Sequence, residues 1–409
     1  MYFLLSKDSP LIPYLLLFLQ IACWAEMDLF VPSLPEILRD FGTTESVIQW
    51  TFSLNFLGFF LSSLIVGPLA DAYGRRKILL GGSFIFAMGA IVSFIAPDIE
   101  IFLLGRLIQG LGVGAPAVIT FAILGDLYQG EKQIKIMSLI NSIITVTMAL
   151  APIIGAYIAS SLGWRANFGC ICLLAILGLL TVCLFVPETL PNNQRHNFSF
   201  KDIFLNYKRL ILNKSYIFTA IGLCALITPY FVFVSIISLI FIDELGLSMS
   251  QYVIYQSAVV GCFSFFSLFM PFITNRTDTQ LLNKASIAMS FIAAFLLAMH
   301  GLIIADQPFS ITFLMCIYAT GLVLPCTVMY VAATEAIPEL RASASALFQS
   351  IRMLMLSLGT SITGMFYNHT YAPIGIITGL LVFIGCIFLL PALWSLTKDS
   401  FTKRVVISH

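Results

Sequence analysis

The sequence predicts an all-α polytopic membrane protein, with twelve transmembrane helices arranged as two six-helix bundles. The 409 residues are 59% hydrophobic and only 10% charged, against about 25% charged in soluble domains. The mean hydropathy is +0.98. Apolar runs long enough to cross a bilayer, which takes about 20 residues, recur along the whole chain. Together they leave no room for a sizeable soluble domain.

The apolar runs give the expected spans in order. They cover residues 11–32, 46–68, 78–96, 101–124, 135–160, 164–186, 216–242, 249–273, 285–305, 309–334, 342–366 and 372–395. The breaks between them are short, except for a polar, basic and partly amphipathic stretch between the sixth and seventh runs. We therefore expect a first bundle over 1–186, a linker over 187–215 that lies on the membrane surface, and a second bundle over 216–409.

The basic residues predict the orientation. If the N-terminus is cytoplasmic and the spans alternate, seventeen lysines and arginines fall on the cytoplasmic side and only Arg39 and Arg165 on the other. Such a bias is typical of cytoplasmic loops. We expect a protein of the inner membrane, with both termini and the linker in the cytoplasm.

Composition also excludes several function classes. A net charge of +1 gives no case for nucleic acid binding. The nine cysteines all lie in apolar stretches and are expected to pack as small hydrophobic residues. Cys170 and Cys172 have no further cysteine or histidine nearby, so we expect neither a metal site nor a cofactor. The first apolar run lacks a small-residue cleavage site and is not expected to be a cleaved signal.

The loop between the second and third runs reads GPLADAYGRRKILL. Gly67 and Gly74 allow close backbone approach and a tight turn. Asp71 can cap a neighbouring helix N-terminus, and Arg75 and Arg76 can reach carboxylates on adjacent helices. The spacing resembles the signature loop of the major facilitator superfamily, which implies a gate. The plainer alternative is an ordinary basic cytoplasmic loop.

Two further motifs carry the same resemblance. The fourth run begins GRLIQGLGVGAP, where Arg106 followed by glycines resembles the family's helix-4 motif. Asp126, at the other end of that helix, is then expected to pair with the basic loop. Pro152 and Gly155 in the fifth run resemble the family's antiporter motif, although two of its usual glycines are alanines here.

Other segments narrow the resemblance to one branch. They read MDLFVPSLPEI, GWRANF, PETL, TPYFVFVSIISLIFIDELGLS and ELRASASALFQSIR. Together they are similar to the Bcr/CflA branch of the 12-spanner drug:proton antiporters, over nearly the whole chain. This resemblance implies two rocking bundles, proton coupling, and efflux of a small organic molecule, as in multidrug resistance.

Four charged residues fall inside spans, where each costs several kcal/mol unless it is paired or faces water: Glu26, Asp28, Arg106 and Arg352. At about 1.5 Å per residue, both acids lie at nearly the depth of Arg106. Being two residues apart on a helix, the acids cannot both face one cavity. The resemblance favours Asp28 as the proton carrier, with Glu26 as second candidate. The structural alternative is an ion pair between Asp28 and Arg106 that only holds helices together.

The same reasoning gives the expected substrate contacts. Arg352 lies near the middle of its span with no acid at its depth in the second bundle. Asn55 and Gln109 bring uncharged hydrogen-bonding groups to the depth of Arg106. Tyr230 and Phe233 either line the cavity or face lipid. We expect these residues, with Arg106, to bind substrate.

We therefore expect a monomeric, non-enzymatic transporter whose partners are protons, lipid and a small organic substrate, most simply an efflux antiporter. One alternative is a transporter of an anionic metabolite or carboxylate siderophore, exported or imported, which two buried arginines favour. The other is a membrane enzyme or a sensor that has lost transport. No HExxH or nucleophile constellation in the sequence favours it.

Overall fold

A computed structural model describes residues 4–398, apart from residues 8, 192, 194, 196, 197, 275, 276, 304 and 305. Within this part all regular structure is helical. The first group of helices is α1 (Ile12–Asp28), η1 (Val31–Ser33), α2 (Leu34–Phe41), α3 (Glu45–Tyr73), α4 (Arg75–Ile95), α5 (Ile99–Leu127), α6 (Gly130–Leu162) and α7 (Trp164–Phe185). The second part is α8 (Phe200–Leu212), α9 (Lys214–Ser238), η3 (Leu239–Glu244), α10 (Met249–Thr274), α11 (Thr279–Ile303), α12 (Pro308–Thr334), η4 (Pro338–Leu340), α13 (Arg341–Phe366) and α14 (Ala372–Lys398).

The predicted spans correspond to these helices. Eleven helices of the described residues are long and apolar enough to cross a membrane. The twelfth, α13, is more polar because it carries several serines and threonines, and two of these form hydrogen bonds with α3. Ser350 Oγ lies 2.7 Å from Ser63 Oγ, and Thr360 Oγ1 lies 2.8 Å from Ser53 Oγ. The predicted all-α polytopic fold is confirmed.

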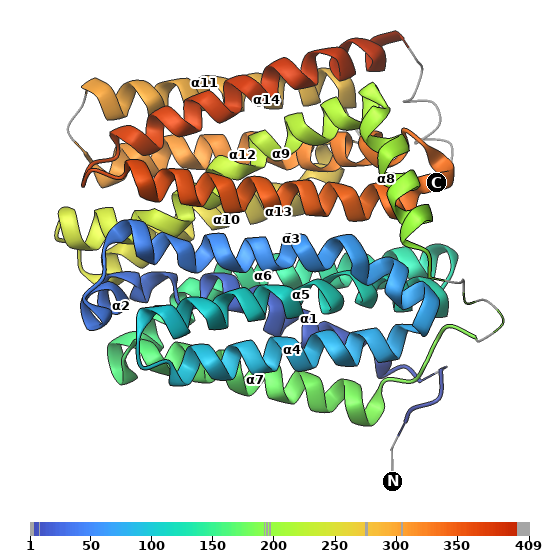
Figure 1. Cartoon of the computed structure of the whole chain (residues 1–409). Helices are drawn as coiled ribbons and strands as arrows, with labels where there is room; N and C mark the ends of the chain where they lie inside the picture. Colours follow the sequence, from blue (N-terminus) through green and yellow to red (C-terminus); the bar gives the residue numbers. More distant parts are fainter. Residues whose placement is uncertain are drawn as a thin grey trace.

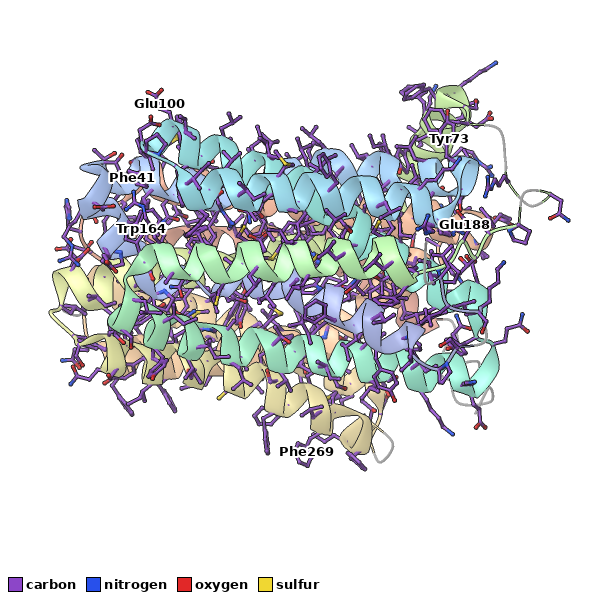
Figure 2. All side chains as sticks on the ribbon, turned by 90° about the horizontal axis from the view of Figure 1, so that it is seen from below. Phe41, Tyr73, Glu100, Trp164, Glu188 and Phe269 are labelled. Atoms are coloured by element: carbon purple, nitrogen blue, oxygen red, sulfur yellow. The ribbon has the colours of Figure 1, made fainter. Side chains whose placement is uncertain are left out.

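The helices form two groups that lie side by side. In Figure 1, α1 to α7 occupy the lower half and α9 to α14 the upper half, with α3 and α13 adjacent where the groups meet. We call the end that carries α8, Tyr73 and Glu188 the linker end. The opposite end, with α2, Phe41 and Trp164, is the far end (Figure 2).

The first predicted span is interrupted. α1 ends at Asp28 and continues, after η1, as α2. Pro32 lies in η1 and Pro35 in the first turn of α2, and each lacks the amide N–H that a continuous helix would need. Asp28 is therefore the last residue of a helix, beside irregular backbone.

The far end is held closed by contacts between the groups. Arg39 of α2 lies 3.8 Å from the Asp243 carboxylate of η3. Gln49 donates to Ser235 O at 3.0 Å, and Ser46 to Gly364 O at 2.5 Å. These three polar contacts join the two helix groups at the far end.

The linker helix α8 crosses the other end at an angle to the bundles (Figure 1). Its Tyr207 hydroxyl donates to Leu64 O of α3 at 2.8 Å, while Leu210 is buried. Phe200, Phe204 and Leu212 are exposed. That amphipathic pattern is the one expected of a helix on a membrane surface, which stays a prediction.

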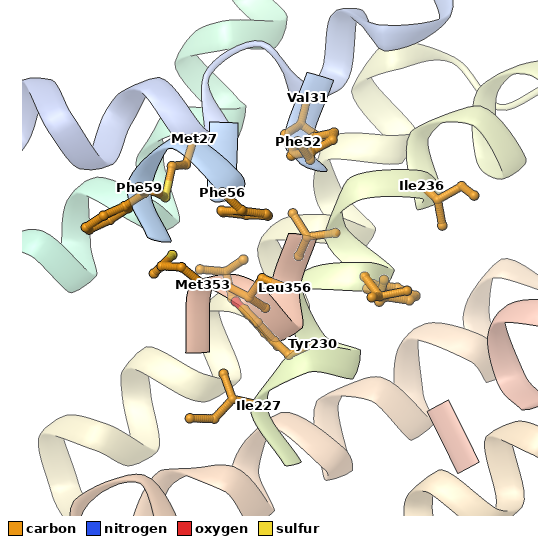
Figure 3. Packing of buried hydrophobic residues seen from close by; sticks show 14 of the residues in the cluster. Met27, Val31, Phe52, Phe56, Phe59, Ile227, Tyr230, Ile236, Met353 and Leu356 are labelled. Atoms are coloured by element: carbon orange, nitrogen blue, oxygen red, sulfur yellow. The ribbon is translucent and has the colours of Figure 1, made fainter. Parts of the chain in front are cut away.

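Apolar side chains from both groups meet midway along the bundle (Figure 3). Met27 and Phe56 approach from the first group, and Tyr230, Met353 and Leu356 from the second. The ring centroids of Phe56 and Phe231 are 6.3 Å apart across this boundary. The charged residues predicted from the sequence lie around this apolar region.

Candidate functional site

A fully buried ion pair lies inside the first group. Arg106 of α5 is 1% exposed and Glu26 of α1 is 0% exposed, with Arg106 Nη1 2.5 Å from Glu26 Oε2. A charged pair removed from water is tolerated only when geometry and further hydrogen bonds compensate the lost solvation. Arg106 thus pairs with Glu26, and the structural pair expected between Asp28 and Arg106 is not formed in this conformation.

Neighbouring side chains complete this pair. Asn55 donates to Glu26 Oε1 at 3.2 Å, and Arg106 Nη1 donates to Gln109 Oε1 at 2.8 Å. The guanidinium also lies over the Phe30 ring, 4.6 Å from its centroid. Asn55 and Gln109, predicted as substrate contacts, are here part of the support for the pair.

Close helix packing sets this geometry. A Cβ on Gly110 would overlap Asn55 O, so α3 and α5 touch through backbone at this point. The glycines after Arg106 therefore bring Asn55 within reach of Glu26. They place the network by allowing close approach.

The carboxylate of Asp28 lies in a different environment. It is 6% exposed and makes no hydrogen bond or ion pair with any described residue. Its charge acts on Tyr230 of α9 and Tyr252 of α10, both in the second group, and the neighbouring charge of Glu26 acts on it. Asp28 is the acid that stands between the two helix groups.

The aromatic residues predicted in the seventh span separate in the structure. Tyr230 lies close enough to Asp28 for the charge of that carboxylate to act on it, and its ring centroid lies 5.9 Å from that of Phe263. Phe233 is 1% exposed and lies in the apolar core. The Tyr252 hydroxyl donates to Gln256 Oε1. Tyr252 was not predicted as a site residue, because neither Tyr252 nor Gln256 stands in a recognisable motif.

Arg352 lies near the middle of α13 and is partly exposed. Its Nε atom is buried and has no hydrogen-bond partner, and its guanidinium forms no ion pair with a described residue. Cys224, Cys326 and Tyr330 are the groups close enough to act on its charge. No carboxylate is among them, as the sequence predicted.

The basic loop forms a compact network at the linker end. Arg75 pairs with Asp71, and its Nε donates to Asp126 Oδ2 at 3.2 Å. Its amide donates to Glu188 Oε1 at 2.9 Å, and Thr189 donates to Asp126 at 2.9 Å. The predicted reach of Arg75 to two helices is thus present within the first group. The PETL string supplied two further members that the sequence analysis did not assign.

The other loop residues differ in what they do. Arg76 donates to Val186 O and Cys183 O, both at 2.8 Å, and so binds carbonyls at the end of α7. Gly74 has φ of 101°, and a Cβ there would overlap Glu188. Gly67 has open space where a Cβ would be, so this conformation contains no close approach at that residue.

A cavity of about 360 Å³ adjoins this loop. It lies between α3, α8 and α13, and Asp71, Asp202, Tyr207 and Ser343 contribute to its lining. Asp71 is 44% exposed, and it shares this cavity with Ser343 at the start of α13.

The predicted antiporter motif packs against the break after α1. A Cβ on Gly155 would overlap Leu29 O, the carbonyl next to Asp28. Asn167 donates to Gly155 O at 3.1 Å and to Ser33 Oγ at 2.8 Å. Pro152, one turn before Gly155, is buried. The motif therefore fixes the backbone that carries Asp28.

One titratable pair lies at the far end, outside the spans. His369 Nδ1 is 2.6 Å from Glu244 Oε1, and this hydrogen bond raises the pKa of His369. Among the described residues, no three histidine, cysteine or acidic side chains gather in a way that could hold a metal ion.

Comparison with known proteins identifies relatives. The sequence profile of the Major Facilitator Superfamily matches residues 16–360. The chloramphenicol resistance protein CraA of Acinetobacter baumannii is 27% identical, over 62% of this chain and 61% of its own. Multidrug resistance protein MdtM of Salmonella typhimurium is 27% identical, over 61% and 60%. The chain thus spans about three fifths of these relatives. The uncharacterized MFS-type transporter YdgK of Bacillus subtilis is 28% identical, over 96% and 97%.

Solved structures with the same fold include two transporters. The partially occluded, inward-open xylose transporter XylE of E. coli has a TM-score of 0.72 at 15% identity, covering 92% of this chain and 96% of its own. The peptide transporter POT has a TM-score of 0.73 at 15% identity, covering 94% and 95%. At such identities the likeness concerns the fold.

Proposed function

Because this chain belongs to the Major Facilitator Superfamily, we propose that it is a proton-coupled secondary transporter that exports a small organic molecule across the inner membrane. The family and fold are those of transporters and not of enzymes. Relatives named for chloramphenicol and multidrug resistance support efflux. The protein would act as a monomer, surrounded by lipid.

One observation carries the proposal: Glu26 and Asp28 have different partners. Glu26 is bound to the fixed charge of Arg106. Asp28 lies between the helix groups without such a partner. A carboxylate that is desolvated and unpaired gains more from binding a proton than one held by a guanidinium. Asp28 is therefore the proton carrier in this proposal, and Glu26 is the counter-ion.

Coupling follows from the position of Asp28. Its charge acts on Tyr230 and Tyr252 of the second group, so rocking of one group against the other would change its surroundings. Substrate bound in the same region would then change the affinity of Asp28 for its proton. The rigid backbone at Gly155 and Leu29 would move Asp28 together with α6.

The bias of basic residues assigns the linker end to the cytoplasm in this proposal. The closed far end, joined by Arg39 and Asp243, is then periplasmic, and the conformation is inward-facing. When the linker end closes, Asp71 would reach the start of α13 through the cavity it shares with Ser343. A carboxylate there would be stabilised by the amide groups of the helix N-terminus.

Proteoliposomes that contain a trapped pH-sensitive dye test this function. With the purified protein and an imposed pH gradient, a panel of anionic, neutral and cationic organic molecules that includes chloramphenicol is screened, and at least one of them should dissipate the gradient in a saturable way. Liposomes without protein are the control. Substrate binding without any proton movement would contradict proton coupling, and absence of saturable movement for every class of organic molecule would contradict transport.

A further inference from the structure

The charge of Arg352 is the one feature of the central region that the proton-carrier account leaves unused. Its guanidinium forms no ion pair or hydrogen bond with a described residue, and its Nε is buried without a partner. Arg106, by comparison, is matched by Glu26, Gln109 and a backbone carbonyl. The two arginines inside the predicted spans therefore differ, since Arg106 has partners for its charge and Arg352 has none among the described residues.

An arginine cannot escape this situation by losing its proton. The titratable groups that act on its charge are Cys224, Cys326 and Tyr330. They are thiols and a phenol, which are uncharged at neutral pH. They leave the positive charge uncompensated. A planar guanidinium is well suited to bind a carboxylate or another oxyanion through paired hydrogen bonds.

Two residues of α9 relate the position of the Arg352 charge to that of Asp28. The charge of Arg352 acts on Cys224, and the charge of Asp28 acts on Tyr230. These two α9 residues are six positions apart, which corresponds to roughly 9 Å along the helix. The proton carrier and the guanidinium of Arg352 therefore act at two different levels of α9.

The side chains between these two levels are apolar. Ile227 lies between Cys224 and Tyr230 on α9, and Met353 follows Arg352 on α13 (Figure 3). Phe56 and Phe231 close the region from the two helix groups. Ile227, Met353 and Phe56 are buried and packed together here, and they define an apolar path between the positive charge of Arg352 and the carboxyl group of Asp28.

We propose that the transported substrate is an amphipathic organic anion whose carboxylate or other oxyanion binds Arg352, while its apolar body lies along the path toward Asp28. This inference rests on the proposed transport function and specifies its substrate class. A lipophilic cation would be repelled by Arg352 and would find no carboxylate at that level among the described residues. An anion neutralises Arg352 and leaves Asp28 free to bind or release its proton.

The test uses three matched probes that share one apolar body: 4-phenylbutyrate, its uncharged amide and the cation 4-phenylbutylamine. Binding to the full-length protein is measured by isothermal titration at neutral pH. We expect 4-phenylbutyrate to bind at least about tenfold more tightly than either analogue. Arg352→Gln should abolish that preference, and Arg352→Lys should restore it in part.

Arg341→Gln is the matched control, because Arg341 lies at the start of the same helix, is 61% exposed and pairs with Glu335. Its anion preference should equal that of wild type. Thermal unfolding of each variant shows whether it is folded. The ratio of the three binding affinities reports on the site and does not depend on the fraction of active protein. Equal binding of the three probes, preference for the amine, or an anion preference that survives Arg352→Gln would overturn the proposal.

The same samples separate this inference from the proposed function. Proton-coupled transport of a neutral or cationic drug that is indifferent to Arg352→Gln would overturn the substrate class alone. Arg352-dependent binding of 4-phenylbutyrate, with no proton movement for any probe, would support the anion site and contradict proton coupling.

Discussion

Glu26 and Asp28 lie two residues apart on α1, yet their carboxylates belong to different parts of the protein. Glu26 Oε2 is 2.5 Å from Arg106 Nη1 inside the first group, whereas the charge of Asp28 acts on Tyr230 and Tyr252 in the second. One acid balances a fixed charge and the other remains available. This relationship separates a structural role from a coupling role, and each role can be tested by itself.

Loss of the Glu26 carboxylate should lower the stability of the fold more than it affects proton coupling. Glu26→Gln leaves the Arg106 charge buried without a counter-ion, a loss of about 3–5 kcal/mol. We expect a clearly lower midpoint of thermal unfolding in detergent. The double variant Glu26→Gln with Arg106→Gln should recover much of it, since neither charge is then left alone. Glu131→Gln, which disturbs an exposed pair with Lys135, should leave the midpoint unchanged.

If Glu26→Gln is as stable as wild type, the pair contributes no support to the fold. The assignment of Glu26 as counter-ion would then be wrong.

The loop network should govern turnover. Asp71→Asn and Asp126→Asn each remove a charged acceptor of Arg75, with contacts worth about 1–3 kcal/mol, less for the exposed Asp71. We expect transport rate to fall more than substrate affinity, measured by flux and by binding on the same preparation. Asp202→Asn is the control, because Asp202 lines the same cavity but pairs with no basic side chain among the described residues. A fall in affinity with unchanged turnover would move these residues to the substrate site.

Backbone contact at Gly155 gives a third prediction. Gly155→Ala places a methyl group against Leu29 O, so α6 and the end of α1 must separate, at a cost of about 1–3 kcal/mol or more. We expect a lower unfolding midpoint and impaired proton-driven transport, because Asp28 moves with Leu29. Gly261→Ala, where a Cβ meets open space, should be neutral in both measurements. Normal behaviour of Gly155→Ala would show that this contact does not position Asp28.

The His369–Glu244 pair predicts a small pH dependence. Because Glu244 raises the pKa of His369, the stabilising contribution is complete below the ordinary histidine pKa of about 6.5 and is lost as pH rises through the raised value. The wild-type unfolding midpoint should therefore fall slightly more than that of His369→Gln between about pH 6 and pH 9. His369 is exposed, so the difference is expected to be small. Parallel pH profiles would contradict a charged pair.

The helices could be predicted because hydropathy alone marks a segment that must leave water. The expected run 249–273, for example, corresponds to α10 over Met249–Thr274. Even α13 was found, although its serines and threonines lower its hydropathy. The break after Asp28 was missed because the first run was bounded by hydropathy alone, which takes no account of Pro32 and Pro35.

The pairing of charges could be predicted only in part. Depth along a helix follows from residue number, so Arg106 and the two acids were placed at one level. Which acid turns toward α5 depends on the rotation of α1, which in turn depends on the contact between Gly155 and Leu29 O. That contact joins residues far apart in sequence. Tyr252 was missed for the same reason, because its relation to Asp28 exists only when α10 packs beside the first group.

The most direct test of the account compares proton-driven transport by wild type and by Asp28→Asn in proteoliposomes, with substrate exchange at equal pH measured on the same vesicles. Asp28→Asn keeps the shape of the side chain but cannot carry a proton. We expect it to exchange substrate while losing transport driven by the pH gradient, and the stable double variant of Glu26 and Arg106 to retain that coupling. Full gradient-driven transport by Asp28→Asn would show that the proton binds elsewhere.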